Sequence, residues 1–144
     1  MPALVAMDVD GTIAGADHQL SGRTIAVLRQ LASRGIAGVI VTGRAERVAL
    51  AMARSLGLSA PVISCNGAVV TDPVLGERLR VRQMAPSAVT SAVEVARRRG
   101  CSPSLWTPDA WFADETSAAT DLLTHLLMEP PRFRPLEDVI ATEK

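Results

Sequence analysis

Apolar and polar residues from position 3 to position 67 form blocks that have the lengths of strands and helices. Short apolar runs predict strands, and longer segments with an apolar residue every three or four positions predict helices. The resulting order is strand Ala3–Met7, helix Gly22–Arg34, strand Ile36–Val41, helix Ala45–Leu56 and strand Pro61–Ser64. Such an order with short connections indicates a parallel sheet with right-handed crossovers. We expect its first strand to be buried on both faces.

The pattern changes after residue 67, where turn-linked strands replace the regular alternation of strand and helix. The predicted elements are strands over Ala68–Thr71 and Arg78–Arg82, a helix over Ser87–Arg99, a hairpin of Ser104–Thr107 and Trp111–Ala113 around a Pro108-Asp109 turn, a helix over Asp114–Leu127 and a short helix over Leu136–Ile140. We therefore expect an α/β chain with two parts. Residues 1–83 would hold the parallel sheet, and residues 84–144 a small α+β module.

Polar residues and glycines follow each of the first three predicted strands. They are Asp8 and Asp10, then Thr42 and Gly43, then Asn66 and Gly67. Ligands of parallel α/β sheets bind outside the carboxyl ends of the strands. We therefore expect these residues to face one crevice.

Asp8-Val9-Asp10-Gly11-Thr12 is the sharpest chemical signal in the chain. The first carboxylate can attack phosphorus as a nucleophile, and the second can protonate the leaving oxygen and then activate water. Two carboxylates that face a phosphate need a cation, and Mg²⁺ fits because it prefers oxygen ligands and shares its shell with phosphates. Gly11 allows backbone amides to approach the phosphate. The alternative is a polar turn that only ends the strand.

Three segments together resemble a known family. Asp8-Val9-Asp10-Gly11-Thr12 and Thr42-Gly43-Arg44 are similar to motifs I and II of the haloacid dehalogenase (HAD) superfamily, and Cys65-Asn66-Gly67-Ala68 is similar to a segment of its Cof-type sugar-phosphatase branch. The resemblance implies a Rossmann-like HAD core, incomplete here, followed by the start of an α+β cap. It also implies Mg²⁺-dependent hydrolysis of a small phosphorylated metabolite, expected to be a sugar phosphate, through an aspartyl-phosphate.

The same resemblance assigns roles to individual residues. Asp8 would be the nucleophile and a metal ligand, and Asp10 the general acid/base with its backbone carbonyl on the metal. The residues implied to bind phosphate or substrate are Gly11, Thr12, Thr42, Gly43, Arg44, Asn66 and Gly67. For Arg44, a structural role at the start of the following helix is the alternative to a substrate contact.

Two motifs of the family have no counterpart in this sequence. Motif III supplies a lysine and motif IV further carboxylates, and both would follow the cap. The single lysine, Lys144, is the last residue and does not fit motif III. We therefore expect a chain with weak or no activity and an unpaired apolar sheet edge. The alternatives are a non-catalytic remnant or binding protein, and a phosphotransferase of the phosphomannomutase kind.

Composition narrows the partners and the compartment. The 15 basic and 15 acidic residues balance, which argues against nucleic acid or a membrane surface as partner. No apolar run is long enough to span a bilayer. Cys65 and Cys101 lie far apart without metal-ligand spacing, which is typical of free thiols in a reducing cytoplasm. We expect a cytoplasmic protein.

Several other residues are given structural interpretations. His18 and His125 have no partner at ligand spacing and are expected to be solvated or packed. Trp106, Trp111 and Phe112 are expected in the core of the second module, with a substrate-facing surface as the alternative. The arginine run 97–99 is interpreted as serving the helix dipole and solubility.

Overall fold

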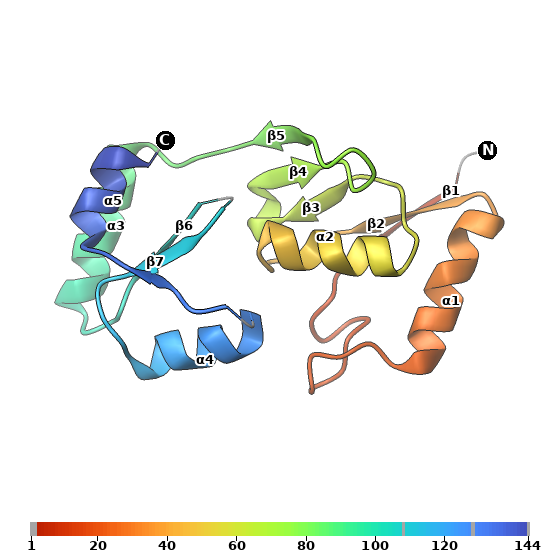
Figure 1. Cartoon of the computed structure of the whole chain (residues 1–144), viewed down its shortest axis with the longest axis horizontal. Helices are drawn as coiled ribbons and strands as arrows, with labels where there is room; N and C mark the ends of the chain where they lie inside the picture. The colour runs from red at the N-terminus through yellow and green to blue at the C-terminus, as the bar shows by residue number, and fades with distance from the viewer. Residues whose placement is uncertain (1–2, 108, 128, 144) are drawn as a thin grey trace. The chain divides into compact units, whose positions relative to one another are not determined.

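The computed structural model describes residues 3–107, 109–127 and 129–143. Pro108 of the predicted hairpin turn and the terminal Lys144 lie outside these residues. The chain divides into two compact units, Met1–Arg82 and Gln83–Lys144 (Figure 1). Each unit has its own hydrophobic core. Their assignment as the core and the cap of a phosphatase remains a prediction.

The strands of the first unit begin as a parallel pair and continue as an antiparallel meander. β1 (Ala3–Met7) pairs in parallel with β2 (Ile36–Ile40) along its whole length. β3 (Val62–Ser64), β4 (Val69–Thr71) and β5 (Arg78–Val81) pair antiparallel in chain order. A parallel bridge between Val41 and Ile63 connects β2 to β3. The parallel start predicted from the sequence is confirmed.

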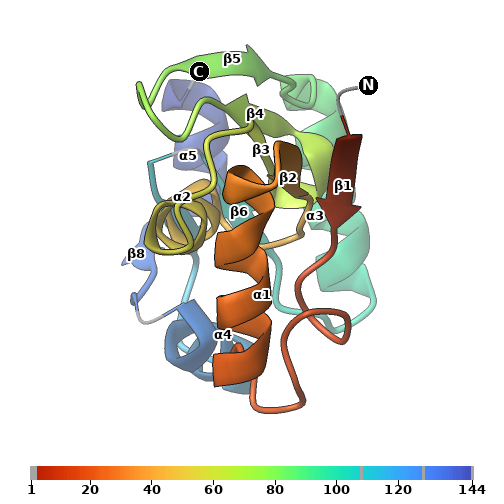
Figure 2. The same ribbon diagram turned by 90° about the vertical axis from the view of Figure 1, so that its right-hand side faces the viewer.

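Two helices cover one side of these strands (Figures 1 and 2). α1 (Gly22–Ser33) follows the first strand, and α2 (Glu46–Ser55) follows the second. Their apolar faces meet the sheet in one core, which includes Met7, Val9, Leu28, Ile40, Ala49, Ala53 and Val62. Burial of this apolar area is the main force that orders the unit. At Gly38 a β-carbon would lie 3.0 Å from the Leu31 side chain of α1 and 2.9 Å from that of Leu58, so α1 packs closely on β2 at this position.

The burial predicted for the first strand is wrong. Four of the five residues of β1 are exposed and only Met7 is buried. Leu4 is 63% exposed. Within the described residues β1 pairs only with β2, so its other edge lies open. A strand needs neighbours on both edges and cover on both faces to bury its apolar residues, and an edge strand lacks part of that cover.

The second unit is a three-stranded sheet with three helices. In chain order the elements are α3 (Pro86–Arg98), β6 (Ser104–Trp106), β7 (Trp111–Ala113), α4 (Ala118–Leu127), β8 (Arg132–Phe133) and α5 (Leu136–Thr142). β6 and β7 form the predicted antiparallel hairpin, and β8 pairs in parallel with β7. The sequence pattern does not predict β8, because a strand of two residues is too short to show a period. Among the described residues, no helix is long and apolar enough to cross a membrane.

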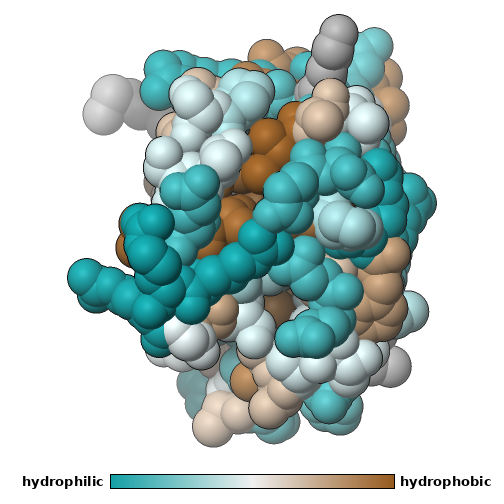
Figure 3. Space-filling view, turned by 90° about the vertical axis from the view of Figure 1, so that its left-hand side faces the viewer, coloured by the Kyte–Doolittle hydropathy of each residue, from teal (hydrophilic) through white to brown (hydrophobic). Residues whose placement is uncertain are grey.

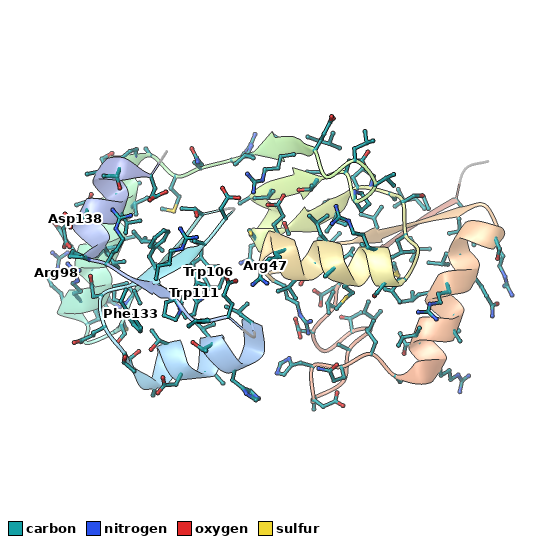
Figure 4. All side chains as sticks on the ribbon, viewed as in Figure 1. Arg47, Arg98, Trp106, Trp111, Phe133 and Asp138 are labelled. Carbon is teal, nitrogen blue, oxygen red and sulfur yellow. The ribbon has the colours of Figure 1, made fainter. Side chains whose placement is uncertain are left out.

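The core of the second unit surrounds Phe112. This side chain is 1% exposed and packs with Val93, Leu136 and Val139. Trp111 is also buried, and its ring stacks on that of Trp106 with centroids 5.4 Å apart (Figure 4). The core prediction is thus confirmed for Trp111 and Phe112. It is wrong for Trp106, which is 40% exposed because it lies on an edge strand and covers its neighbour.

Arg97 does more than balance the helix dipole. Its guanidinium pairs with Asp114, at 2.6 Å, and with Glu137, so it joins α3 to the chain on either side of α4. Asp114 also accepts the amide of Leu136 at the start of α5. The helix predicted from Asp114 begins only at Ala118, where the Ser117 hydroxyl accepts the amide of Thr120 at 3.2 Å as an N-cap. On the face shown in Figure 3, hydrophilic residues form a band across the surface, and hydrophobic residues are visible between them.

Phe112→Ala tests whether the second unit depends on this core. Removal of a fully buried phenyl ring costs about 3–5 kcal/mol of unfolding free energy. Both tryptophans lie in the second unit, so urea unfolding followed by tryptophan fluorescence reports on this unit alone. The matched control is Phe133→Ala, since Phe133 is 51% exposed on the neighbouring strand and should cost about 0.5 kcal/mol or less. Equal losses for the two variants would contradict the described core.

Candidate active site

The loop after β1 is built around the buried Val9. Its side chain is 0% exposed, and its carbonyl oxygen accepts the amides of Thr12, Ile13 and Ala14 at 2.8–3.2 Å. Gly11 takes a φ of 76° within this tight turn, a conformation that favours glycine. Because Val9 points into the core, the carboxylates of Asp8 and Asp10 on either side of it are exposed. The turn thereby presents both candidate catalytic groups at the end of the strand.

Asp8 and Asp10 have different partners. The Thr12 hydroxyl donates to Oδ2 of Asp8 at 3.0 Å. Asp10 receives the Arg44 guanidinium as a fork, with Nε 2.9 Å from Oδ2 and Nη2 2.7 Å from Oδ1. Nδ1 of His18 lies 2.8 Å from Oδ1 of the same carboxylate. The Asp10 carboxylate therefore pairs with both Arg44 and His18, whereas the Asp8 carboxylate accepts one hydrogen bond, from the Thr12 hydroxyl.

The Arg44 fork sets the protonation of Asp10. Its hydrogen bonds, aided by that from His18 and opposed by partial burial, lower the pKa of Asp10 to about 2 from the ordinary value of 3.8. The pair likewise raises the pKa of Arg44. Asp10 is therefore a carboxylate at neutral pH. The fork also ties the loop after β1 to the loop after β2.

The loops after β2 and β3 are joined through their backbones. Thr42, 4% exposed, accepts the amide of Arg44 on its hydroxyl and the amide of Asn66 on its carbonyl, at 3.1 and 3.2 Å. The amide of Cys65 donates to the Arg44 carbonyl at 2.9 Å. A β-carbon on Gly43 would lie 2.8 Å from Oδ1 of Asn66. A larger residue at position 43 would therefore displace the Asn66 side chain from this place.

The third loop is a 3₁₀ turn, η1 (Cys65–Gly67), with an unusual backbone. Cys65, Asn66 and Gly67 all have positive φ values, of 51°, 55° and 90°. For a non-glycine residue this region is sparsely populated, and such conformations cluster at functional sites. Asn66 and Gly67 are exposed at the end of β3, and the Asn66 side chain lies beside Gly43.

A buried carboxylate at the start of α2 pairs with side chains of β4 and β5. Glu46, the first residue of α2, is 6% exposed and accepts hydrogen bonds from the Thr71 hydroxyl and from Arg78, whose Nε lies 2.9 Å from Oε2. This fixes the start of the helix against β4 and β5. A buried carboxylate requires such partners, because an unpaired one would be very costly. The sequence pattern gave no signal for it, since Thr71 and Arg78 belong to other elements.

The structure brings Asp10, Arg44, Thr42 and Asn66 into one hydrogen-bonded network, beside which Asp8 pairs with Thr12 inside the first turn. His18, expected to be merely solvated or packed, lies within this network. Its spacing of eight residues from Asp10 carries no periodic signal, and the contact arises only because residues 11–20 fold back on themselves. Among the described residues, no group of three or more His, Cys, Asp or Glu side chains forms a ready metal site.

Arg44→Gln tests the electrostatic origin of the low pKa. We expect the pKa of Asp10 to rise from about 2 towards 3.8, measured by ¹³C NMR titration of the side-chain carboxyl. Because the folded pKa is depressed, the pair stabilises the fold above pH 3.8, and this contribution disappears as the pH falls towards 2. The stability difference between wild type and variant should therefore shrink over that window. Arg23→Gln, on the exposed start of α1, serves as control and should leave the Asp10 titration unchanged.

Comparison with known proteins identifies the family. The model of the haloacid dehalogenase-like hydrolases matches residues 5–136. The chain is 43% identical over 70 residues to phosphatase YwpJ from Bacillus subtilis, which covers 49% of this chain and 25% of that protein. It is 28% identical over 114 residues to an HMP-PP phosphatase from Serratia proteamaculans, which covers 79% of this chain and 41% of that protein.

Solved structures give the same picture of the fold. A haloacid dehalogenase-like hydrolase from B. subtilis has a TM-score of 0.71 and 28% identity, over 85% of this chain and 42% of that one. A phosphatase of the HAD enzyme superfamily from Bacteroides thetaiotaomicron has a TM-score of 0.76 and 23% identity, over 99% and 53%. The chain thus spans about a quarter to a half of the length of these proteins. With its family match over nearly all described residues, the chain belongs to the haloacid dehalogenase-like hydrolases.

Proposed function

We propose that this protein is a Mg²⁺-dependent phosphatase in which Asp8 accepts the phosphoryl group and Asp10 transfers the protons. The observation that carries the proposal is the placement of two exposed carboxylates on either side of the buried Val9, with Asp10 held by Arg44 of the loop after β2. A turn that only ended the strand would not need a second loop to hold its carboxylate.

The proposed reaction has two steps. A carboxylate oxygen of Asp8 attacks phosphorus and forms an aspartyl-phosphate, while the bond to the leaving oxygen breaks and that oxygen takes a proton from Asp10. Water then attacks the aspartyl-phosphate, gives its proton to Asp10, and phosphate leaves with Asp8 regenerated. The amide of Gly43 and the hydroxyl of Thr42 would stabilise the charge that spreads over the phosphoryl oxygens.

The residues present fit a Mg²⁺ ion only in part. Mg²⁺ is commonly held by one or two carboxylates, with water and substrate phosphate completing its octahedral shell. Asp8 would contribute its carboxylate and Asp10 its backbone carbonyl. When bound, the ion would offset the negative charge of the phosphate and of the two aspartates. Because the described residues lack a third nearby carboxylate, we propose weak metal affinity and impaired turnover for this chain.

The Arg44 fork constrains the proposed acid/base. At neutral pH Asp10 is ionised, so it is ready to accept a proton from water but not to donate one. A general acid works best when its pKa lies near the working pH. Proton donation to the leaving group therefore requires that Arg44 release one carboxylate oxygen. The negative phosphoryl group of a bound substrate is a competing acceptor for the same guanidinium.

We propose a small phosphorylated metabolite, with a sugar phosphate as first candidate, as substrate, and the cytoplasm as compartment. The curated relatives carry the names of different phosphatases, among them HMP-PP and phosphoglycolate phosphatases. What these proteins share is a small phosphorylated substrate rather than one particular leaving group. The names of the relatives therefore support phosphoryl transfer from a small metabolite, and the choice of a sugar phosphate rests on the sequence resemblance.

Asp8→Asn tests the proposed nucleophile. We expect the wild-type chain to release phosphate slowly from p-nitrophenyl phosphate, and only with Mg²⁺ present. The variant should lose on the order of 100-fold or more, because the amide cannot form the covalent intermediate. Asp121→Asn, on the exposed face of α4, is the matched control and should keep wild-type turnover. Equal activity of Asp8→Asn and wild type would refute the assignment.

A second assay separates the alternatives. Calorimetric titration with inorganic phosphate plus Mg²⁺, in wild type and in Asp8→Asn, reports binding without turnover. Binding that depends on Asp8 in a chain without hydrolysis would favour the non-catalytic alternative. Conversion of a sugar phosphate to its isomer without phosphate release would favour the phosphotransferase.

A further inference from the structure

His18 contacts both Asp10, the proposed acid/base, and Arg44, which pairs with it. Its Nδ1 lies 2.8 Å from Oδ1 of Asp10, and its backbone carbonyl accepts Nη2 of Arg44 at 3.0 Å. Since an ionised carboxylate can only accept, Nδ1 carries the proton and donates it. One residue thus binds both partners of the ion pair, through its side chain and through its main chain.

The loop that carries His18 is held in place by local hydrogen bonds. The amide of His18 donates to the Gly15 carbonyl at 2.9 Å, and the amide of Gly15 donates to the Gln19 carbonyl at 3.1 Å. The Asp17 side chain accepts the amide of Gln19 at 3.0 Å. His18 itself has a φ of 59°, in the left-handed region that residues with a β-carbon rarely adopt. Such a conformation persists only where its surroundings enforce it.

We propose that His18 is a positioning residue that holds the Asp10 carboxylate in line when Arg44 releases it. The inference rests on the proposed function, in which Asp10 protonates the leaving oxygen. Arg44 occupies both carboxylate oxygens, whereas His18 occupies only Oδ1. If Arg44 turns to a bound phosphoryl group, His18 remains on Oδ1 and leaves Oδ2 free to carry the proton.

Exposure supports an orienting role over a stabilising one. The side chains of His18 and Asp10 are 49% and 40% exposed. Pairs this exposed contribute little to folding, because water screens them and competes for the same groups. Restricting a carboxylate to one rotamer, in contrast, acts directly on the geometry of proton transfer, which tolerates little misalignment.

Two substitutions at position 18 separate the side chain from the backbone. His18→Gly removes the imidazole and accepts a positive φ without strain, so it leaves the loop conformation allowed. His18→Asn also tolerates a positive φ, and its amide nitrogen can donate at a position close to that of Nδ1. His125→Ala, an exposed histidine on α4, is the matched control.

The readout is kcat for two substrates with different leaving groups, each measured with Mg²⁺. Methyl phosphate needs a proton on its leaving oxygen, whereas p-nitrophenolate leaves without one. Asp10→Asn should lower kcat for methyl phosphate by on the order of 100-fold and for p-nitrophenyl phosphate far less. His18→Gly should show the same preference at about tenfold, with KM nearly unchanged. His18→Asn should restore most of this loss, and His125→Ala should match wild type.

The outcomes are distinguishable. If Asp10→Asn affects both substrates equally, or wild type releases no phosphate, the proposed function fails and the inference fails with it. If Asp10→Asn shows the preference but His18→Gly slows both substrates equally or neither, only the role of His18 is refuted. If His18 had a purely structural role, His18→Gly would lower kcat for both substrates by the same factor. His18→Asn would then not restore the rate for methyl phosphate selectively.

Discussion

The burial of Val9 is the constraint on which the candidate site depends. A side chain that must point into the core forces the residues before and after it to point out, and its carbonyl collects the amides that close the turn. The two aspartates are therefore exposed as a consequence of packing, at a point where the chain leaves the sheet. The hydrogen bonds from Thr12, Arg44 and His18 are all made to carboxylates whose positions this turn determines.

The second level of organisation is a chain of hydrogen bonds between loops. Arg44 joins the first loop to the second, and the Thr42 carbonyl joins the second to the third. Glu46 anchors the helix that follows the second loop, so that loop is restrained at both ends. The local parts of this arrangement are weak by themselves. Together they hold the loops after β1, β2 and β3 in fixed positions relative to one another. A site whose groups are held in this way is preorganised before a ligand binds.

The helices, the strands and the residues at the strand ends are predictable from the sequence because they depend on local pattern. The spacing of apolar residues and the glycines between segments predict the bounds of β1, α1, β2 and α2 to within two residues. Prediction from the sequence fails where contacts between distant segments decide the structure. The exposure of β1 and the short strand β8 depend on which strands pair, and the late start of α4 depends on the hydrogen bonds at its N-terminus. His18 and Glu46 were missed for the same reason, since their partners lie in other segments and no spacing connects them.

The open edge of β1 has a consequence for the molecule in solution. Within the described residues this edge presents unpaired amide and carbonyl groups beside the exposed Leu4, and strands of other molecules can extend such an edge. Proteins often oppose such pairing by mutual charge repulsion, yet here acidic and basic residues cancel. A net charge or an inward-pointing lysine added at this edge would therefore oppose association through it.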